Sequence, residues 1–163
     1  MTPAAAASRQ KVLAGSQGIP VQLRSASLTV SISLDADSWA IQAAADRDQL
    51  ALDLLGVEFN GPPTAYYEIY LDLPAETRNP SPGIINFVGK LTPRMKRELT
   101  PGSDLGARVS YSVGGIVRAL TKSAVWNPDV LTVTFVPRGI SEVDHRASTV
   151  RARIAALQIV SAN

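Results

Sequence analysis

Residues 27–34 read Ser-Leu-Thr-Val-Ser-Ile-Ser-Leu, so polar and apolar side chains alternate without a break. Successive side chains of a β-strand point to opposite faces of the sheet. The alternation therefore predicts a half-buried strand, whose buried face is formed by Leu28, Val30, Ile32 and Leu34. The serine and threonine side chains of the other face are expected to meet solvent.

The same period of two recurs along the rest of the chain. It predicts further strands over residues 21–23, 50–59, 66–73, 84–91, 107–113, 130–137 and 148–160. A short helix is expected over residues 113–123, where Ile116, Val117 and Leu120 recur at helical spacing. Seven or eight short strands joined by turns predict an all-β fold, an antiparallel β-sandwich of jelly-roll type with one short helix.

The strand predicted over residues 50–59 changes phase at Leu55–Gly56, because its leucines and its last two apolar residues fall on opposite faces. A β-bulge there would turn both Leu52 and Val57 inward, since glycine tolerates the backbone that a bulge needs. We then expect Gly56→Val to destabilise the fold by about 1–3 kcal/mol. The strand over residues 148–160 changes phase in the same way at Ala155–Ala156.

The length of 163 residues suits one domain, and 45% apolar against 18% charged residues is the balance of a chain that folds. We expect residues 19–163 to form a single β-sandwich domain. Residues 1–18 are small and polar, and are expected to be a flexible arm or linker. Residues 74–83 contain three prolines and no apolar run, which predicts a long exposed loop.

Composition excludes several kinds of site. The chain has no cysteine and one histidine, His145, so disulfides, thiolate catalysis and a histidine cluster for a metal are excluded. His145 lies in a polar segment with no Gly-x-Ser-x-Gly motif in the chain, which favours a solvated loop residue over a catalytic base. A net charge of +2 and the lack of an 18-residue apolar run argue against nucleic acid and membrane as partners.

Weaker patterns have plain structural explanations. Acidic residues in pairs, such as Asp35 and Asp37, lack the further oxygen ligands of a calcium loop, and Gly114–Gly115 is better explained as a helix entry than as an anion site. The densest positive stretch carries Lys90, Arg94, Lys96 and Arg97. Within it, residues 91, 95 and 99 are apolar at four-residue spacing, either as a turn packed on the core or as an apolar tip offered to a partner.

Five short motifs, in the same order along the chain, resemble those of the C-terminal domain of plant-type polyphenol oxidases and bacterial tyrosinases, which is named for its Lys-Phe-Asp-Val motif. Tyr67, Glu68 and Ile69 stand for its Phe, acid and Val, and Tyr70 follows them. The other four motifs are Leu54–Glu58, Asn86–Gly89, Val133–Gly139 and Ile154–Ile159. The resemblance covers about residues 49–160, and departs at Thr92–Met95, where the family has Pro-His.

The resemblance implies a β-sandwich that covers the dicopper site of a tyrosinase-type catalytic domain and keeps the enzyme latent. In that family a helical domain supplies six histidines to the copper pair, and this chain has one histidine. The chain is therefore expected to be non-catalytic, with no metal site or cofactor of its own. The dicopper centre is expected in the partner, which is a catalytic domain attached in cis or supplied in trans.

The resemblance also implies that a loop after the Asn86–Gly89 motif places one side chain in the partner's substrate pocket. Met95 is the first candidate for this plug, because a flexible thioether adapts to an irregular pocket, and Leu91 is the second. Lys90, Arg94, Lys96 and Arg97 would remain at the rim of that pocket. The alternative, that Leu91 and Met95 pack on the chain's own core, remains open.

Two other functions are compatible with the sequence. A copper-delivery accessory would need soft or imidazole ligands, for which the chain offers Met1, Met95 and His145. A ligand-binding sandwich would present an exposed row of aromatic side chains, drawn from Trp39, Tyr66, Tyr70 and Trp126. The exposure of those four aromatic residues distinguishes this last function from the others.

Overall fold

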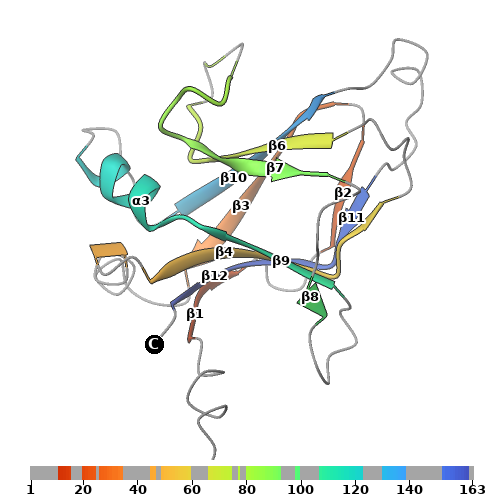
Figure 1. Ribbon diagram of the computed structural model, residues 1–163, viewed down its shortest axis with the longest axis horizontal. Coiled ribbons are helices and arrows are strands. Elements are labelled where there is room, and N and C mark those ends of the chain that lie inside the picture. Colours follow the sequence, from red (N-terminus) through yellow and green to blue (C-terminus); the bar gives the residue numbers. More distant parts are fainter. Residues whose placement is uncertain are drawn as a thin grey trace, which may run out of the picture.

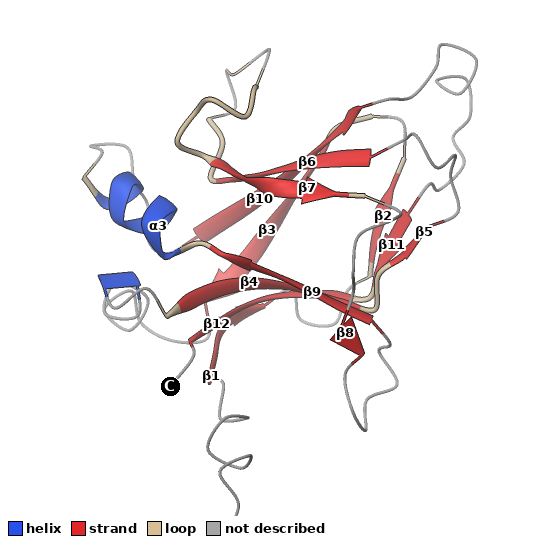
Figure 2. Cartoon of the chain, in the orientation of Figure 1, coloured by secondary structure: helices blue, strands red, loops and turns tan. Residues whose placement is uncertain are grey.

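In the residues that it describes, the computed structural model consists mostly of β-strands (Figure 1, Figure 2). It describes residues 11–15, 20–24, 26–34, 45–46, 49–59, 66–74, 77, 80–92, 98–99, 107–122, 130–138 and 152–161. The elements are, in chain order, β1 (Lys11–Gly15), β2 (Val21–Leu23), β3 (Leu28–Leu34), β4 (Leu50–Leu55), β5 (Glu58–Phe59), β6 (Tyr66–Leu71), β7 (Phe87–Leu91), β8 (Glu98–Leu99), β9 (Ala107–Ser112), α3 (Gly114–Thr121), β10 (Val130–Arg138), β11 (Ala152–Ile154) and β12 (Ala156–Ser161).

The strands form two antiparallel sheets. The longer sheet has the order β7-β6-β10-β3-β1-β12-β4-β9-β8, and the smaller has the order β2-β11-β5. The longer sheet folds over between β3 and β1, for which the described residues give the register pairs Ala14–Leu34 and Gly15–Ser33. Figure 1 shows the two resulting layers, with the smaller sheet at one end and α3 at the other. This architecture confirms the predicted all-β sandwich with a short helix.

The core lies between the two layers and is formed by the faces that the alternation predicts. Ile32, Leu52, Leu54, Ile69, Val133, Phe135 and Ile159 have no exposed surface. Burying a side chain of this size stabilises the folded state by about 1.5–3 kcal/mol relative to leaving it exposed. The buried residues Val117 and Leu120 of α3 cover one end of the core, as the helical spacing predicts.

The predicted phase changes are corners at which two strands pass from one sheet to the other. Leu52 and Val57 are both buried, as predicted. However, β4 belongs to the longer sheet and β5 to the smaller one, so Gly56 lies at a break between strands rather than in a bulge within one. The break between β11 and β12 lies beside it, where the N–H of Ala155 donates to the carbonyl of Leu55 at 2.8 Å.

Gly56 has a φ of 65°, in the left-handed region where a β-branched side chain is strained. We expect Gly56→Val to lower the free energy of unfolding by about 2 kcal/mol, and Gly56→Asn to cost clearly less, because asparagine tolerates this backbone. Urea denaturation of both variants measures the difference. Equal losses for the two variants would show that side-chain volume, and not backbone conformation, limits this position.

Two sequence-based boundaries are wrong. Lys11–Gly15 was expected within a flexible arm, but it forms β1, which pairs with β12 and β3. Its apolar residues Val12 and Leu13 are adjacent instead of alternate, so the period of two gave no signal of this strand. The strand predicted from residue 84 begins at Phe87, because residues 81–87 form turns closed by the hydrogen bonds Ile84 N–H to Ser81 and Phe87 N–H to Ile84, each of 3.2 Å. The extent of the domain over residues 19–163 remains a prediction.

Candidate functional site

Three of the five motif segments lie on adjacent strands. Strand β6, which carries Tyr67–Tyr70, pairs with β10 on one side and β7 on the other. These neighbours carry the Val133–Gly139 and Asn86–Gly89 motifs, of which residues up to 138 are described. The rings of Tyr70 and Phe87 meet edge to face, with centroids 5.6 Å apart. The remaining two motifs meet at the corner formed by Leu55 and Ala155.

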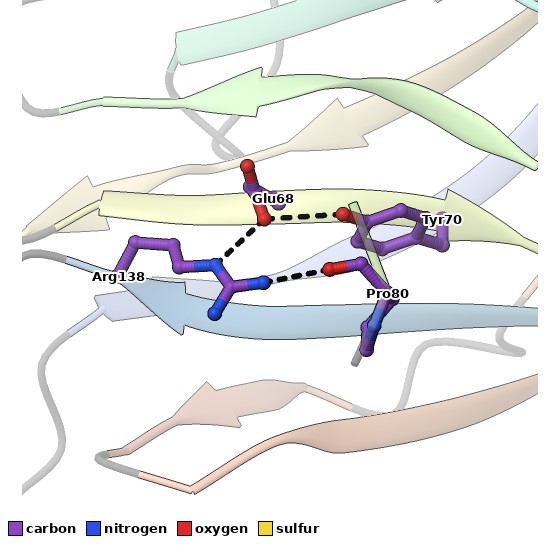
Figure 3. A network of polar contacts seen from close by, with 4 residues as sticks. All are labelled: Glu68, Tyr70, Pro80 and Arg138. Carbon is purple, nitrogen blue, oxygen red and sulfur yellow. Dashed lines mark hydrogen bonds and ion pairs between the residues drawn. The ribbon is translucent and has the colours of Figure 1, made fainter. Parts of the chain in front are cut away.

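A buried carboxylate connects β6 with β10 (Figure 3). Glu68, which the sequence resemblance matches to the acidic position of the Lys-Phe-Asp-Val motif, is 4% exposed. Its Oε1 accepts a hydrogen bond from Arg138 Nε at 2.7 Å and another from the Tyr70 hydroxyl at 3.1 Å. Arg138 Nη2 also donates to the carbonyl of Pro80 at 2.8 Å. The guanidinium thus connects two neighbouring strands to the segment that precedes β7.

The electrostatics of this cluster fit a structural role. Burial and the hydrogen bond to Glu68 raise the pKa of Tyr70 to about 12. The same carboxylate raises the pKa of Arg138 above its usual value. Tyr70 is therefore neutral and Arg138 charged at any physiological pH, and Glu68 already accepts hydrogen bonds from both. Groups held in this way contribute orientation and stability, with no activated nucleophile among them.

The chain after β6 turns sharply and is fixed to β7. Asp72 has a φ of 53°, and its N–H donates to the carbonyl of Thr132 at 2.7 Å. The buried side chain of Asn86 donates to the carbonyls of Leu71 and Asp72 at 3.0 and 3.1 Å. Together with Arg138, these bonds fix both ends of the segment between Asp72 and Asn86.

Burial raises the pKa of the Asp72 carboxyl. Because the folded-state pKa lies above the unfolded one, the contribution of this group is fully present below the unfolded pKa of about 4 and is lost as the pH rises through the folded pKa. We expect Asp72→Asn to stabilise the protein by about 0.5 kcal/mol at neutral pH, since the site is partly exposed and solvent screens the charge. Urea titrations at neutral pH and near pH 3 test this, and a gain that persists unchanged in acid would contradict it.

The structure tests only some of the residues predicted for the plug and its rim. Leu91 is fully buried in the core, so it is not available to a partner, and its selection as a plug candidate is wrong. Lys90 is exposed and its Nζ lies 5.5 Å from the centre of the Tyr66 ring. Met95, Arg94, Lys96 and Arg97 lie outside the described residues, so their assignment remains a prediction.

Sequence reasoning missed Ile85. It is 57% exposed, and no other large hydrophobic side chain of the described residues is exposed. It follows Ile84 and directly precedes the anchored Asn86, so the turn before β7 presents it outward. The sequence analysis places the two adjacent isoleucines in a strand. The Pro82–Gly83 dipeptide just before them is typical of a turn, and it could have indicated that the strand begins later.

The described residues give no support to the two other sites considered, an aromatic ligand-binding row and a metal site. Tyr70 is fully buried and Tyr66 is half-buried, while Trp39 and Trp126 lie outside the described residues. The described aromatic residues therefore do not form the flat exposed row that ligand binding would need. Within the described ranges, no three His, Cys, Asp or Glu side chains come together in a possible metal site. No helix among those ranges has the length and apolar character needed to span a membrane.

Solved structures of polyphenol oxidases share this fold. One is a recombinant latent aurone synthase, a polyphenol oxidase, with a TM-score of 0.54 and 13% identity over 88% of this chain. Another is the latent apple tyrosinase, with a TM-score of 0.54 and 14% identity over 90% of this chain. No protein-family model matches the sequence, and no curated protein matches it.

Both matches cover most of this chain and only a small part of the matched enzyme. They include nearly all of this chain but only 26% of the aurone synthase and 28% of the apple tyrosinase. The chain thus corresponds in fold to about a quarter of each enzyme. At 13–14% identity, the likeness establishes the fold alone.

Proposed function

We propose that this chain is a non-catalytic regulatory domain that covers the dicopper active site of a tyrosinase-type catalytic domain and keeps that enzyme latent. The observation that carries the proposal is the fold match, which includes nearly all of this chain and about a quarter of two polyphenol oxidases whose structures are of latent forms. Five motifs of the family's C-terminal domain, found from the sequence, support the same assignment.

The arrangement of those motifs adds physical support. Residues at the acidic position of one motif and the arginine position of another form the Glu68–Arg138 ion pair. This pair connects strands that are far apart in sequence, so the two motifs have a common structural purpose. A coincidental likeness of short motifs would not require their side chains to be partners.

The chemistry of the chain fits a covering role better than a catalytic one. A dicopper centre needs several imidazole ligands, and the chain contains one histidine. The copper would therefore be held by the partner. The contribution of this chain would be to exclude substrate from the partner's pocket, with an apolar side chain inserted and charged side chains at the rim.

Met95 remains the first candidate for the inserted side chain, and Ile85 replaces Leu91 as the second. A plug must be exposed when the partner is absent, and Ile85 meets that requirement whereas Leu91 does not. Ile85 precedes β7 in the sequence and Met95 follows it, so variants of each residue test the two candidates separately.

The test uses the catalytic domain of a plant polyphenol oxidase freed of its own C-terminal region. Adding this chain in trans should lower the rate of catechol oxidation at least about tenfold at saturation, with micromolar affinity. Ile85→Ser or Met95→Gly should weaken that inhibition, and Lys122→Ser, at the far end of α3, should not. The isolated chain should neither oxidise catechol nor retain copper after loading and dialysis. No inhibition at any concentration, or two tightly held copper ions per chain, would contradict the proposal.

A further inference from the structure

The outer face of the β3–β10 pair carries hydroxyl side chains. Val133 and Phe135 of β10 are buried in the core, so Thr134 and its partner on β3, Thr29, lie on the opposite face. Their hydroxyl oxygens are 2.9 Å apart, at hydrogen-bond distance. Thr134 is only 6% exposed, and residues of the segment that follows β6 lie opposite it across a small hollow.

This hollow has a volume of about 180 Å³ and no charged residue in its lining. Hydroxyl groups come from Ser27, Thr29, Thr77 and Thr134, and apolar rings come from Pro74 and Pro80. Sites for drug-sized ligands are larger, at about 300–1,000 Å³. At about 30 Å³ for each water molecule, the hollow has room for about six waters, which a ligand of a single ring would displace.

Both sides of the hollow are fixed by hydrogen bonds. Its floor is the ladder between β3 and β10. On the other side, the N–H of Thr77 donates to the carbonyl of Pro74 at 3.0 Å, and the carbonyl of Pro80 accepts from Arg138 at 2.8 Å (Figure 3). The hydroxyl groups are therefore held in place before a ligand arrives, which lowers the entropy cost of binding.

The hydroxyl pair on the floor has unused hydrogen-bonding capacity. A hydroxyl group donates one hydrogen bond and accepts two, so the bond between Thr29 and Thr134 leaves one donor and three acceptor positions. Among the described residues, neither side chain makes another hydrogen bond. A charged ligand would lose its hydration and find no opposite charge in the lining. A neutral ring with hydroxyl groups at its edge and C–H groups on its faces matches both the hydroxyl floor and the proline wall.

We infer that this hollow binds a single neutral sugar ring. The ring's hydroxyl groups bond to Thr29 and Thr134 on the floor and to Thr77 opposite, and a C–H face lies against Pro74 and Pro80. A free monosaccharide and the terminal residue of a glycan share this chemistry, and the experiment includes both forms. The site does not depend on the proposed function.

The experiment titrates the ¹⁵N-labelled chain with D-glucose, D-galactose and D-mannose and with their methyl α-glycosides, and follows the backbone amide shifts by NMR. We expect saturable shifts at Thr29, Thr77 and Thr134 with at least one of these sugars, at a Kd of about 1–10 mM, and none at Ser110 in the other layer. Thr134→Val keeps the side-chain shape and removes the hydroxyl, so it should weaken binding at least about fivefold.

The matched control is Thr132→Val, which lies on the same face of β10 but outside the hollow, and which should leave the Kd unchanged. Thr29→Val is a second variant at an exposed position, where the fold tolerates the change, and it should weaken binding as Thr134→Val does. Tighter binding of the methyl glycosides would assign the site to the end of a glycan, and tighter binding of the free sugars to a monosaccharide.

Three outcomes would overturn the inference. The first is the absence of a saturable shift with any of these sugars at about 100 mM. The second is a Kd that neither Thr29→Val nor Thr134→Val raises above the value of the Thr132→Val control. The third is binding of D-glucuronate as tight as that of D-glucose, because a neutral lining should discriminate against the charged ring.

Discussion

Arg138→Ala is expected to lower the free energy of unfolding by about 3 kcal/mol. The substitution leaves the Glu68 carboxylate, which is 4% exposed, without its cationic partner. Although the Arg138 side chain is 39% exposed, removing it costs more than the pair contributes, because the remaining Glu68 charge stays out of water. The carbonyl of Pro80 also loses a hydrogen-bond donor. Urea denaturation at neutral pH measures the loss.

A double-mutant cycle separates the charge effect from the loss of packing. Glu68→Gln removes the charge but keeps the shape of the side chain, so Arg138→Ala should cost about 1–2 kcal/mol less in that background. Arg153→Ala is the matched control, because Arg153 is exposed on β11, and its cost should stay within about 0.5 kcal/mol. If the cost of Arg138→Ala is the same with glutamate or glutamine at position 68, the ion pair does not couple the strands.

The fold could be predicted from the sequence wherever apolar and polar side chains alternate along a strand. Apolar and polar residues alternate along all of β3 and over Leu131–Phe135 of β10, and both strands were predicted within a residue of their observed ends. Strand β1 has two adjacent apolar residues, Val12 and Leu13, in place of an alternation, so periodicity could not reveal it. Gly56 was recognised as special, but a sequence cannot distinguish a bulge from a corner, because both need the same backbone conformation.

The sequence identified individual residues of the candidate site, but it did not predict which of them are in contact. The sequence identified Glu68 and Arg138 in separate motifs, but the register of β6 against β10 decides that they meet. Leu91 was misassigned because an apolar residue beside charged ones looks the same whether it ends a buried strand or begins an exposed loop. Ile85 was missed for the converse reason, since two adjacent isoleucines usually indicate burial.

Gly89→Ala is expected to lower the free energy of unfolding by about 2–3 kcal/mol, because β7 and β9 approach each other closely at this residue. A Cβ at position 89 would lie 2.8 and 2.9 Å from two carbons of the Tyr111 ring. That ring is unable to yield, since it is buried and its hydroxyl donates to the carbonyl of Lys90 at 2.8 Å. Burial also raises the pKa of Tyr111, so the hydroxyl stays a donor throughout the neutral range. The layers of the sandwich must therefore separate locally to admit the methyl group.

The matched control for this prediction is Gly83→Ala, where the nearest atom to a new Cβ is the Ser81 hydroxyl oxygen at 3.9 Å. That variant should change the free energy of unfolding by less than about 0.5 kcal/mol. A second arm uses Tyr111→Leu, which removes the ring: in that background Gly89→Ala should cost about 1–2 kcal/mol less than in the parent. If the penalty at position 89 is the same with and without the ring, steric contact between β7 and β9 is not its cause. If the cost of Gly89→Ala disappears when the Tyr111 ring is removed, the ring is the reason for glycine at the end of the Asn86–Gly89 segment. Strand β7 must pass beside this aromatic side chain, which connects the two layers.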